Sequence, residues 1–254
     1  MSKIMVLPDI QAKDGIDFTY LTNIGKYMVE KKPDIVVCIG DFADMPSLSS
    51  YDVGKKSFEG RRYTKDIAAA QAAQISLFTP LMQYQAMQAK NKKRVYDPFK
   101  IMLLGNHENR INRAIDCDAK LEGLISVEDL AYNAFWNEVH PFLEVVTIDG
   151  IAFSHYFTTG QAGRPSSTAN AQLNKQHMSC ISGHQQGLQI AMAQRADGTR
   201  LTSVIAGSCY EHDEDYLGPQ GNKHWRGLLM LHEVDNGQFD LMTVTLNYIN
   251  RKYA

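Results

Sequence analysis

The sequence predicts an α/β fold in which two β-sheets pack face to face and helices cover the outer surfaces. Two patterns support this prediction. The first half of the chain alternates short apolar runs with a segment of helical periodicity, as βαβ units do. The second half carries Asp-Gly or Asn-Gly pairs at residues 149–150, 197–198 and 236–237, each flanked by apolar runs as in tight β-hairpins. We expect the first pattern to form one sheet and the three hairpins to form a second.

The first sheet is predicted from three apolar runs. Those at residues 4–7 and 35–39 predict two short buried strands. The amphipathic segment 16–31 between them predicts a helix that ends before Pro33, because proline cannot continue a helix. A further apolar run at residues 101–104 predicts the next strand of the same sheet.

A long segment at about residues 45–99 interrupts this alternation. It is predicted to form a polar loop at 47–63 and a helix rich in Ala and Gln at 64–89. Its basic side chains include Lys55, Lys56, Arg61, Arg62, Lys90, Lys92, Lys93 and Arg94. We interpret the segment as a helical basic insertion that sets specificity, since a phosphate-rich substrate would fit such a surface. A solvated helix face accounts for the same charges equally well.

The second half begins with a helix start and continues with strands. Ser126 followed by Asp129 resembles a capping box and predicts a helix that opens there. The apolar runs of the three hairpins cover residues 143–148 and 151–154, 188–195 and 201–206, and 228–234 and 239–246. The chain has no repeat period, low-complexity tract or linker, so we predict a single domain over residues 1–254.

Composition and charge argue against several classes of protein. Of the 254 residues, 44% are hydrophobic and 21% are charged, as in ordinary globular proteins. A net charge of -2 argues against a protein that holds nucleic acid mainly by bulk electrostatics. The N-terminal apolar run is too short for a signal peptide, and no run approaches the roughly 18 residues of a membrane span. The four cysteines lie far apart, which argues against disulfides and a thiolate zinc site. We predict a cytoplasmic protein that does not bind membranes.

Polar side chains follow the predicted strands of the first sheet. Asp9 and Asp41 come shortly after the first two strands, and Asn106 with His107 follows the third strand after a glycine. Because the carboxyl ends of parallel strands meet at one edge of a sheet, these side chains are expected to lie close together. A carboxylate at Asp41 is well placed there to bridge two cations.

The second half adds two imidazoles to this set. His155 follows the apolar run 151–154, and His184 follows Gly183 after a short apolar stretch. If the two sheets face each other, both rings reach the same edge as the carboxylates. Carboxylate, amide oxygen and neutral imidazole together suit divalent ions such as Mn²⁺, Fe²⁺, Zn²⁺ or Mg²⁺.

These residues also form an ordered series of motifs. Gly-Asp-x-x-Asp occurs at residues 40–44 and Gly-Asn-His-Glu at 105–108, with Asp-x-Gln at 9–11 before them and Gly-His-x-Gln at 183–186 after them. In this order the motifs resemble those of the calcineurin-like metallophosphoesterase superfamily. The resemblance implies a four-layer αββα sandwich of two mixed β-sheets flanked by helices, and an enzyme that hydrolyses phosphate esters.

The resemblance also implies a role for each motif residue. Asp41 would bridge two divalent metal ions, and His107 would protonate the leaving group or stabilise its developing charge, so both are catalytic candidates. The other implied metal ligands are Asn106, His155 and His184 around one ion, and Asp9, Gln11 and Gln186 around the other. Asp44 would order the loop behind these ligands instead of binding a metal.

Gln11 and Gln186 depart from the family pattern, which usually has histidines at both positions. The carbonyl oxygen of glutamine is neutral and is a weaker ligand than imidazole for zinc or iron. Either this second site keeps a loosely held, oxygen-preferring ion such as Mn²⁺ or Mg²⁺, or it is vacant and the protein works with one metal or none. We expect two divalent ions, with Mn²⁺ preferred over Mg²⁺, Fe²⁺, Zn²⁺ or Ni²⁺.

We therefore expect a metal-dependent phosphoesterase in which a metal-activated water attacks phosphorus, with phosphodiesters preferred over phosphomonoesters. A nucleotide or a nucleic-acid end is the candidate substrate. Arg110 follows the Asn-His-Glu motif, and Tyr210 and His212 follow a predicted strand, so these three are candidate substrate contacts. The alternative is a degenerate, non-catalytic phosphate- or nucleotide-binding protein, which the two glutamines favour and the otherwise intact motifs oppose.

Overall fold

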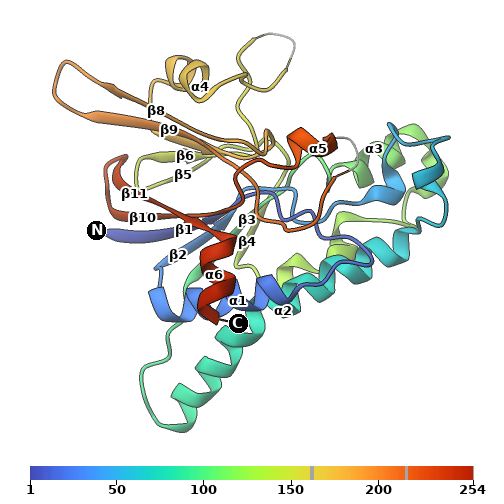
Figure 1. Cartoon of the computed structure of the whole chain (residues 1–254), viewed down its shortest axis with the longest axis horizontal. Helices are drawn as coiled ribbons and strands as arrows, with labels where there is room; N and C mark the ends of the chain where they lie inside the picture. Colours follow the sequence, from blue (N-terminus) through green and yellow to red (C-terminus); the bar gives the residue numbers. More distant parts are fainter. Residues whose placement is uncertain (161–162, 215–216, 254) are drawn as a thin grey trace.

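The structure, a computed structural model, describes residues 1–160, 163–214 and 217–253. The described strands form two mixed sheets that pack face to face, with helices on the outer face of each sheet (Figure 1). The first sheet has the strand order β11-β10-β1-β2-β3-β4, and the second has the order β5-β6-β7-β9-β8. The predicted four-layer αββα sandwich is therefore confirmed.

Each sheet combines parallel and antiparallel strands. The first contains the parallel strands β1 (Ser2–Leu7), β2 (Ile35–Cys38), β3 (Phe99–Leu103) and β4 (Glu138–His140), extended by the antiparallel hairpin of β10 (Gly227–Asp235) and β11 (Gln238–Thr245). In the second, the parallel strands β6 (Ile151–Phe153), β7 (Cys180–Ser182) and β9 (Arg200–Ala206) lie between the antiparallel strands β5 (Val146–Ile148) and β8 (Leu188–Gln194).

The described part of the chain contains six helices, four of which cover the outer faces of the sheets. The six helices are α1 (Thr19–Lys31), α2 (Tyr63–Lys90), α3 (Arg110–Cys117), α4 (Ala169–Gln176), α5 (Gly218–Gly221) and α6 (Leu246–Tyr253). Short 3₁₀ turns occur at Pro46–Leu48, Lys56–Phe58, Ala119–Leu121, Val127–Leu130 and Tyr132–Ala134. Helices α1, α2 and α6 lie on the side of the first sheet, and α4 packs on β8 and β9 of the second (Figure 1).

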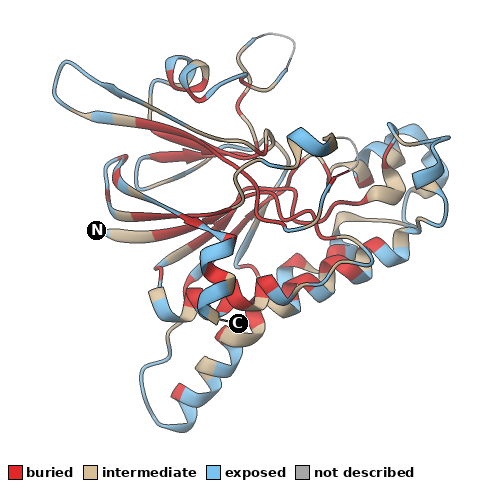
Figure 2. Ribbon diagram, in the orientation of Figure 1, coloured by how far each residue is buried: buried red, intermediate tan, exposed pale blue. Residues whose placement is uncertain are grey.

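Alternate side chains of the central strands pack into two different layers. In β1, Ile4 and Val6 lie between the two sheets, whereas Met5 and Leu7 belong to the cluster that the helices cover. A central strand that is buried on both faces has to be apolar at nearly every position. Figure 2 shows this burial in both sheets and on the inner faces of α1 and α2. The packing fixes the strand ends, and with them the loops that carry the polar motifs.

The third predicted hairpin belongs to the first sheet, not to the second. Its strand β10 pairs antiparallel with β1, with Ile4 opposite Leu231. An Asn-Gly turn predicts that two strands pair with each other, but it carries no information on which sheet they join. Leu229 and Leu231 pack between the sheets, while Leu228 and Met230 face the helices, so β10 has the same two-sided burial as β1.

Two predicted helix starts also differ from the structure. Ser126 and Asp129 do form a capping box, but it opens only a 3₁₀ turn, Val127–Leu130. Ala131 ends this turn in the left-handed conformation at φ 55. Helix α1 begins later than residue 16, because the Asp17 carboxylate accepts hydrogen bonds from the backbone N–H and the hydroxyl of Thr19.

Helix α2 forms most of the segment that the sequence marked as an insertion. It packs closely on α1, since a Cβ atom at Gly25 would lie 2.3 Å from the Leu77 carbonyl oxygen. The 28 residues of α2 span about 40 Å, so the basic residues before its first turn and after its last turn cannot contact the same phosphate group. Neither α2 nor any other helix in the described part of the chain is long and apolar enough to span a membrane.

Candidate metal centre

The carboxyl ends of five strands carry the predicted metal ligands to one edge of the sandwich. Asp9, Asp41 and Asn106 follow β1, β2 and β3 of the first sheet, while His155 and His184 follow β6 and β7 of the second. One ligand atom each of Asp41, His155 and His184 lies within 4.8 Å of the others. The structure therefore brings together side chains from both sheets.

Asn106 lies between the two imidazoles. Its Oδ1 atom is 2.8 Å from Nε2 of His155 and 2.7 Å from Nδ1 of His184. Nδ1 of His155 lies 2.9 Å from the carbonyl oxygen of Ile39, which can only accept a hydrogen bond, so this nitrogen carries the proton of the neutral ring. The lone pair of His155 Nε2 then faces the lone pairs of Asn106 Oδ1. A divalent cation fits such a donor set and would relieve the repulsion.

His184 is suited to act as a neutral ligand. Burial, and to a lesser extent the neighbouring His155 ring, lower the pKa of its imidazole to about 4. Near neutral pH the ring is therefore uncharged, and a nitrogen lone pair is available for a metal ion. Tyr156 packs on the same ring, with ring centroids 4.8 Å apart, and helps to hold its position.

Two glycines allow the metal-binding loops to approach each other. A Cβ atom at Gly105 would lie 2.1 Å from Oδ1 of Asp41, and one at Gly40 would lie 2.6 Å from Nδ1 of His155. Gly40 also has φ +98, a conformation that other residues rarely adopt. Any side chain at either position would push the carboxylate and the imidazole apart.

Glu108 joins the loops that follow β2 and β3. Its buried carboxylate accepts hydrogen bonds from the backbone N–H groups of Asp41 (3.1 Å), Ala43 (2.8 Å) and Gly105 (2.8 Å), and from the Tyr132 hydroxyl (2.9 Å). Burial raises the pKa of Glu108, and the nearby Asp41 carboxylate adds to this effect. The sequence alone predicts no role for Glu108, since its place in the motif indicates none of these partners.

The second half of the centre contains polar atoms without partners. Asp9 is fully buried, and its Oδ1 accepts a hydrogen bond from the His184 backbone, whereas its Oδ2 has no partner among the described residues. Burial and the Asp41 carboxylate raise the pKa of Asp9 to about 7. Neither amide atom of the buried Gln11 has a partner in the described chain. Because orphaned buried polar atoms are costly, Asp9 Oδ2 and Gln11 Oε1 fit a cation better than an empty space.

Gln186 contacts Tyr210, which the sequence predicted as a candidate substrate contact. Its Oε1 accepts a hydrogen bond of 2.7 Å from the Tyr210 hydroxyl. Tyr210 is fully buried and stacks on His212, with ring centroids 4.6 Å apart, while Nε2 of His212 lies 2.7 Å from Oε1 of Glu214. The structure thus corrects the expected position of Tyr210 and His212: burial places both side chains behind the cleft wall, where they support other residues.

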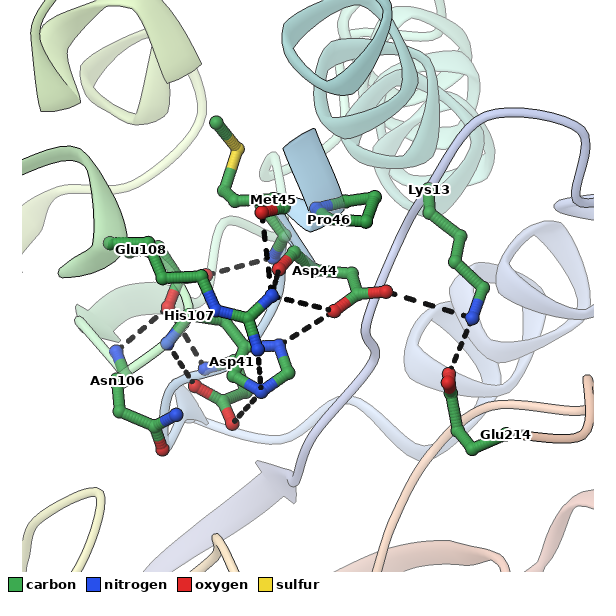
Figure 3. A network of polar contacts seen from close by, with 12 residues as sticks. Lys13, Asp41, Asp44, Met45, Pro46, Asn106, His107, Glu108 and Glu214 are labelled. Atoms are coloured by element: carbon green, nitrogen blue, oxygen red, sulfur yellow. Dashed lines mark hydrogen bonds and ion pairs between the residues drawn. The ribbon is translucent and has the colours of Figure 1, made fainter. Parts of the chain in front are cut away.

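His107 is held from three sides (Figure 3). Its backbone N–H donates to Asp41 Oδ1 (2.9 Å), and its Nδ1 lies 2.8 Å from Oδ1 of Asp44. Nη2 of Arg110 lies 3.0 Å from Nε2 of His107, and Nη1 of Arg110 donates to the Asp44 carbonyl oxygen (2.7 Å). Burial alone would raise the pKa of Asp44, but His107 and neighbouring cations bring it well below its ordinary value. Asp44 therefore contacts the ring directly, and Arg110 lies against the same ring.

A cleft of about 1140 Å³ opens from this centre. Its walls include residues of the segment 46–66 and of the loop after β9. They carry six basic and eight acidic side chains, so the cleft as a whole is not strongly basic. Lys55 and Arg61 both pair with Asp52, at 2.8 and 2.9 Å. Attraction of a phosphate group therefore depends on positive charge at the metal centre.

The chain matches one family model and is similar to several solved structures. A family model described as calcineurin-like phosphoesterase matches residues 2–190, which include every predicted metal ligand. No curated protein matches the chain in sequence. Among solved structures, Vps29 from Chaetomium thermophilum is 11% identical with a TM-score of 0.41, and the match covers 96% of this chain and 98% of that one. GAP50, described as the anchor in the inner membrane complex of Plasmodium, is 11% identical with a TM-score of 0.34. This match covers 96% of this chain and 84% of GAP50.

Proposed function

The chain belongs to the calcineurin-like phosphoesterase family, and from this premise we propose that it is a metal-dependent hydrolase of phosphate esters, with phosphodiesters preferred over phosphomonoesters. The observation that carries the proposal is the meeting of Asn106 Oδ1 with ring nitrogens of His155 and His184, beside the Asp41 carboxylate. Two imidazoles, an amide oxygen and a carboxylate that converge in one place are a donor set that suits a divalent cation.

The proposed centre holds two divalent ions, with Mn²⁺ preferred. Asp41 would bridge them, and the remaining ligands would be Asn106, His155 and His184 for one ion and Asp9, Gln11 and Gln186 for the other. When bound, such ions acidify a water molecule and neutralise charge on the phosphoryl oxygens. Mg²⁺, Fe²⁺, Zn²⁺ and Ni²⁺ are the alternatives that the ligand set allows.

His107 is the group that serves the leaving oxygen in this proposal. Hydrolysis joins a water oxygen to phosphorus while the bond to the leaving oxygen breaks, so that oxygen must gain a proton or a compensating positive charge. Asp44 holds Nδ1 of His107, which leaves Nε2 for the substrate. Arg110 contacts Nε2 in the structure, so it has to move from Nε2 to the substrate before His107 can donate there.

A nucleotide or a nucleic-acid end is the substrate that we propose. A cleft of about 1140 Å³ exceeds the volume that a simple monoester needs, which supports an extended ester with groups on both sides of phosphorus. We also propose a cytoplasmic location, which agrees with the free thiols of all four cysteines.

The second candidate function is a non-catalytic phosphate- or nucleotide-binding protein. Gln186 favours it, because its carbonyl oxygen already accepts a hydrogen bond from Tyr210 and is a neutral ligand at best. In this case the protein would bind phosphate esters in the same cleft without hydrolysing them.

Metal removal separates the two candidates. We expect hydrolysis of 4-nitrophenyl phosphate or bis(4-nitrophenyl) phosphate only after Mn²⁺ is added, and a chelator should abolish it. Metal content per chain and rates are measured on protein prepared with and without Mn²⁺. Metal binding without hydrolysis of either ester would favour the binding protein, and activity that survives chelation would contradict the proposed centre.

Restoring histidines tests the second half of the centre. The double variant Gln11→His with Gln186→His is expected to raise the metal content per chain and to shift the preference from Mn²⁺ toward Zn²⁺ or Fe²⁺, because imidazole is the stronger ligand for both. Gln185→His is a matched control, since Gln185 lies on the same loop and donates to the Ser166 carbonyl oxygen instead. If the double variant has the same metal content per chain and the same metal preference as the parent and the control, Gln11 and Gln186 do not line the centre.

A further inference from the structure

A half-buried lysine and a buried glutamate lie next to the contact between Asp44 and His107. Nζ of Lys13, on the loop after β1, is 2.6 Å from Oε1 of Glu214 and 3.6 Å from Oδ2 of Asp44 (Figure 3). We propose that Lys13 and Glu214 are positioning residues that hold Asp44 against His107 and thereby set the efficiency with which His107 serves the leaving group. The inference rests on the proposed function, but the geometric part can be tested without it.

Asp44 needs a partner on each of its two oxygens. Its carboxylate is 9% exposed, and Oδ1 is shared between His107 and Arg110. Oδ2 contacts Lys13. A buried carboxylate that loses one of its cations keeps an uncompensated charge and either rotates or takes up a proton. Loss of Lys13 would therefore weaken the contact on the opposite oxygen, where His107 is held.

Lys13 cannot fix the carboxylate without an anchor of its own. Its ammonium group sits on a flexible four-carbon stem, and its side chain is 21% exposed at the cleft. Glu214 supplies the anchor, because its side chain is only 8% exposed and its contact with Lys13 is the shorter of the two.

Glu214 is itself rigidly placed. Its backbone N–H donates to Asn222 Oδ1 (2.8 Å), and Asn222 Nδ2 donates back to the Glu214 carbonyl oxygen (2.9 Å). Oε1 of Glu214 also lies 2.7 Å from Nε2 of His212, whose ring stacks on Tyr210. These residues lie beyond residue 190, where the match to the family model ends. The chain therefore adds a support for His107 from outside the matched segment.

A salt bridge that only joins a surface loop to the start of a helix would behave differently. Lys65 and Asp14 form such a pair in the wall of the same cleft, at 2.9 Å, with both side chains 56% exposed. No contact links that pair to Asp44. Its loss should alter all substrates alike, whereas loss of the pair behind Asp44 should matter only when the leaving oxygen needs help from His107.

The test compares esters with poor and good leaving groups. Phenol is the poor leaving group and 4-nitrophenol is the good one. We expect Glu214→Gln and Lys13→Met to lower kcat for the phenyl ester by roughly 10-fold, with KM little changed. For the 4-nitrophenyl ester we expect a loss of less than about 2-fold, because a good leaving group needs little help from a general acid. His107→Asn should show the same pattern at about 100-fold or more for the phenyl ester. Lys65→Met, the matched control, should leave the ratio between the two esters as in the parent. Equal losses on both esters would contradict the proposal.

Two further measurements separate positioning from a loss of structure. In the His107→Asn background, Glu214→Gln should have no additional effect, and a full 10-fold additional loss would overturn the proposal. In the metal-free parent protein, NMR of the imidazole nitrogens should show a proton fixed on Nδ1 of His107 by the contact with Asp44. This fixed proton should be lost in Glu214→Gln and in Lys13→Met, but not in Lys65→Met. An unchanged Nδ1 signal would contradict the proposal even if the parent hydrolyses esters. A parent that hydrolyses nothing would contradict only the proposed function, because the NMR result still decides the geometry.

Discussion

Asp41→Asn is expected to abolish metal-dependent hydrolysis, with a loss of roughly 10³-fold or more in kcat/KM. The substitution keeps the shape of the side chain and an oxygen that can accept from the His107 backbone, but it removes the negative charge that would bridge two cations. Metal content per chain, measured after dialysis against Mn²⁺, should fall with the activity. Asn106→Ala should have the same direction of effect.

Asp14→Asn is the matched control for this experiment. Asp14 lines the same cleft, but its carboxylate is exposed and pairs with Lys65. It should keep the metal content and the metal dependence of the parent. An Asp41→Asn protein that still binds the parent's amount of metal would show that Asp41 does not belong to the centre.

Glu108→Gln is expected to have the largest effect on stability. The Glu108 carboxylate accepts four hydrogen bonds, three of them from backbone N–H groups that have to be satisfied in a buried loop. The amide nitrogen of a glutamine would face at least one of these donors with hydrogens of its own. We expect a loss of about 3 kcal/mol in the free energy of unfolding, measured by urea denaturation without metal.

Tyr132→Phe provides the comparison for Glu108→Gln. It removes only the 2.9 Å hydrogen bond from the Tyr132 hydroxyl and leaves the three backbone contacts in place. A loss of about 1 kcal/mol is expected from this single bond. If Glu108→Gln costs no more than Tyr132→Phe, Glu108 does not join the two loops in the way that its contacts indicate.

The predictable part of this structure is the part that local patterns determine. Apolar runs located β1, β2 and β3, and polar residues directly after them identified the edge where Asp41 and Asn106 meet the imidazoles of His155 and His184. The reason is that parallel strands present their carboxyl ends together, so chain order alone brings these residues to one place.

The parts that were not predictable depend on contacts between distant segments. Asn236-Gly237 identified a hairpin, but only the pairing of β10 with β1 assigns that hairpin to the first sheet. Glu108 gathers donors from three segments, and no local pattern reveals an acceptor of this kind. The burial of Tyr210 likewise follows from the packing of the loop after β9 and not from its sequence.

The pairing of β1 with β10 also determines when the first sheet can be completed during synthesis. Ser2 pairs with Val234, so β1 meets its antiparallel neighbour only after the 232 residues that follow Ser2 have been made. Until then β1 has an open edge, and closing so large a loop makes this pairing intrinsically slow. Asp9 lies at the end of that strand. A ribosome-bound chain that stops before β10 therefore holds all the predicted ligands, but its first sheet still lacks the hairpin of β10 and β11.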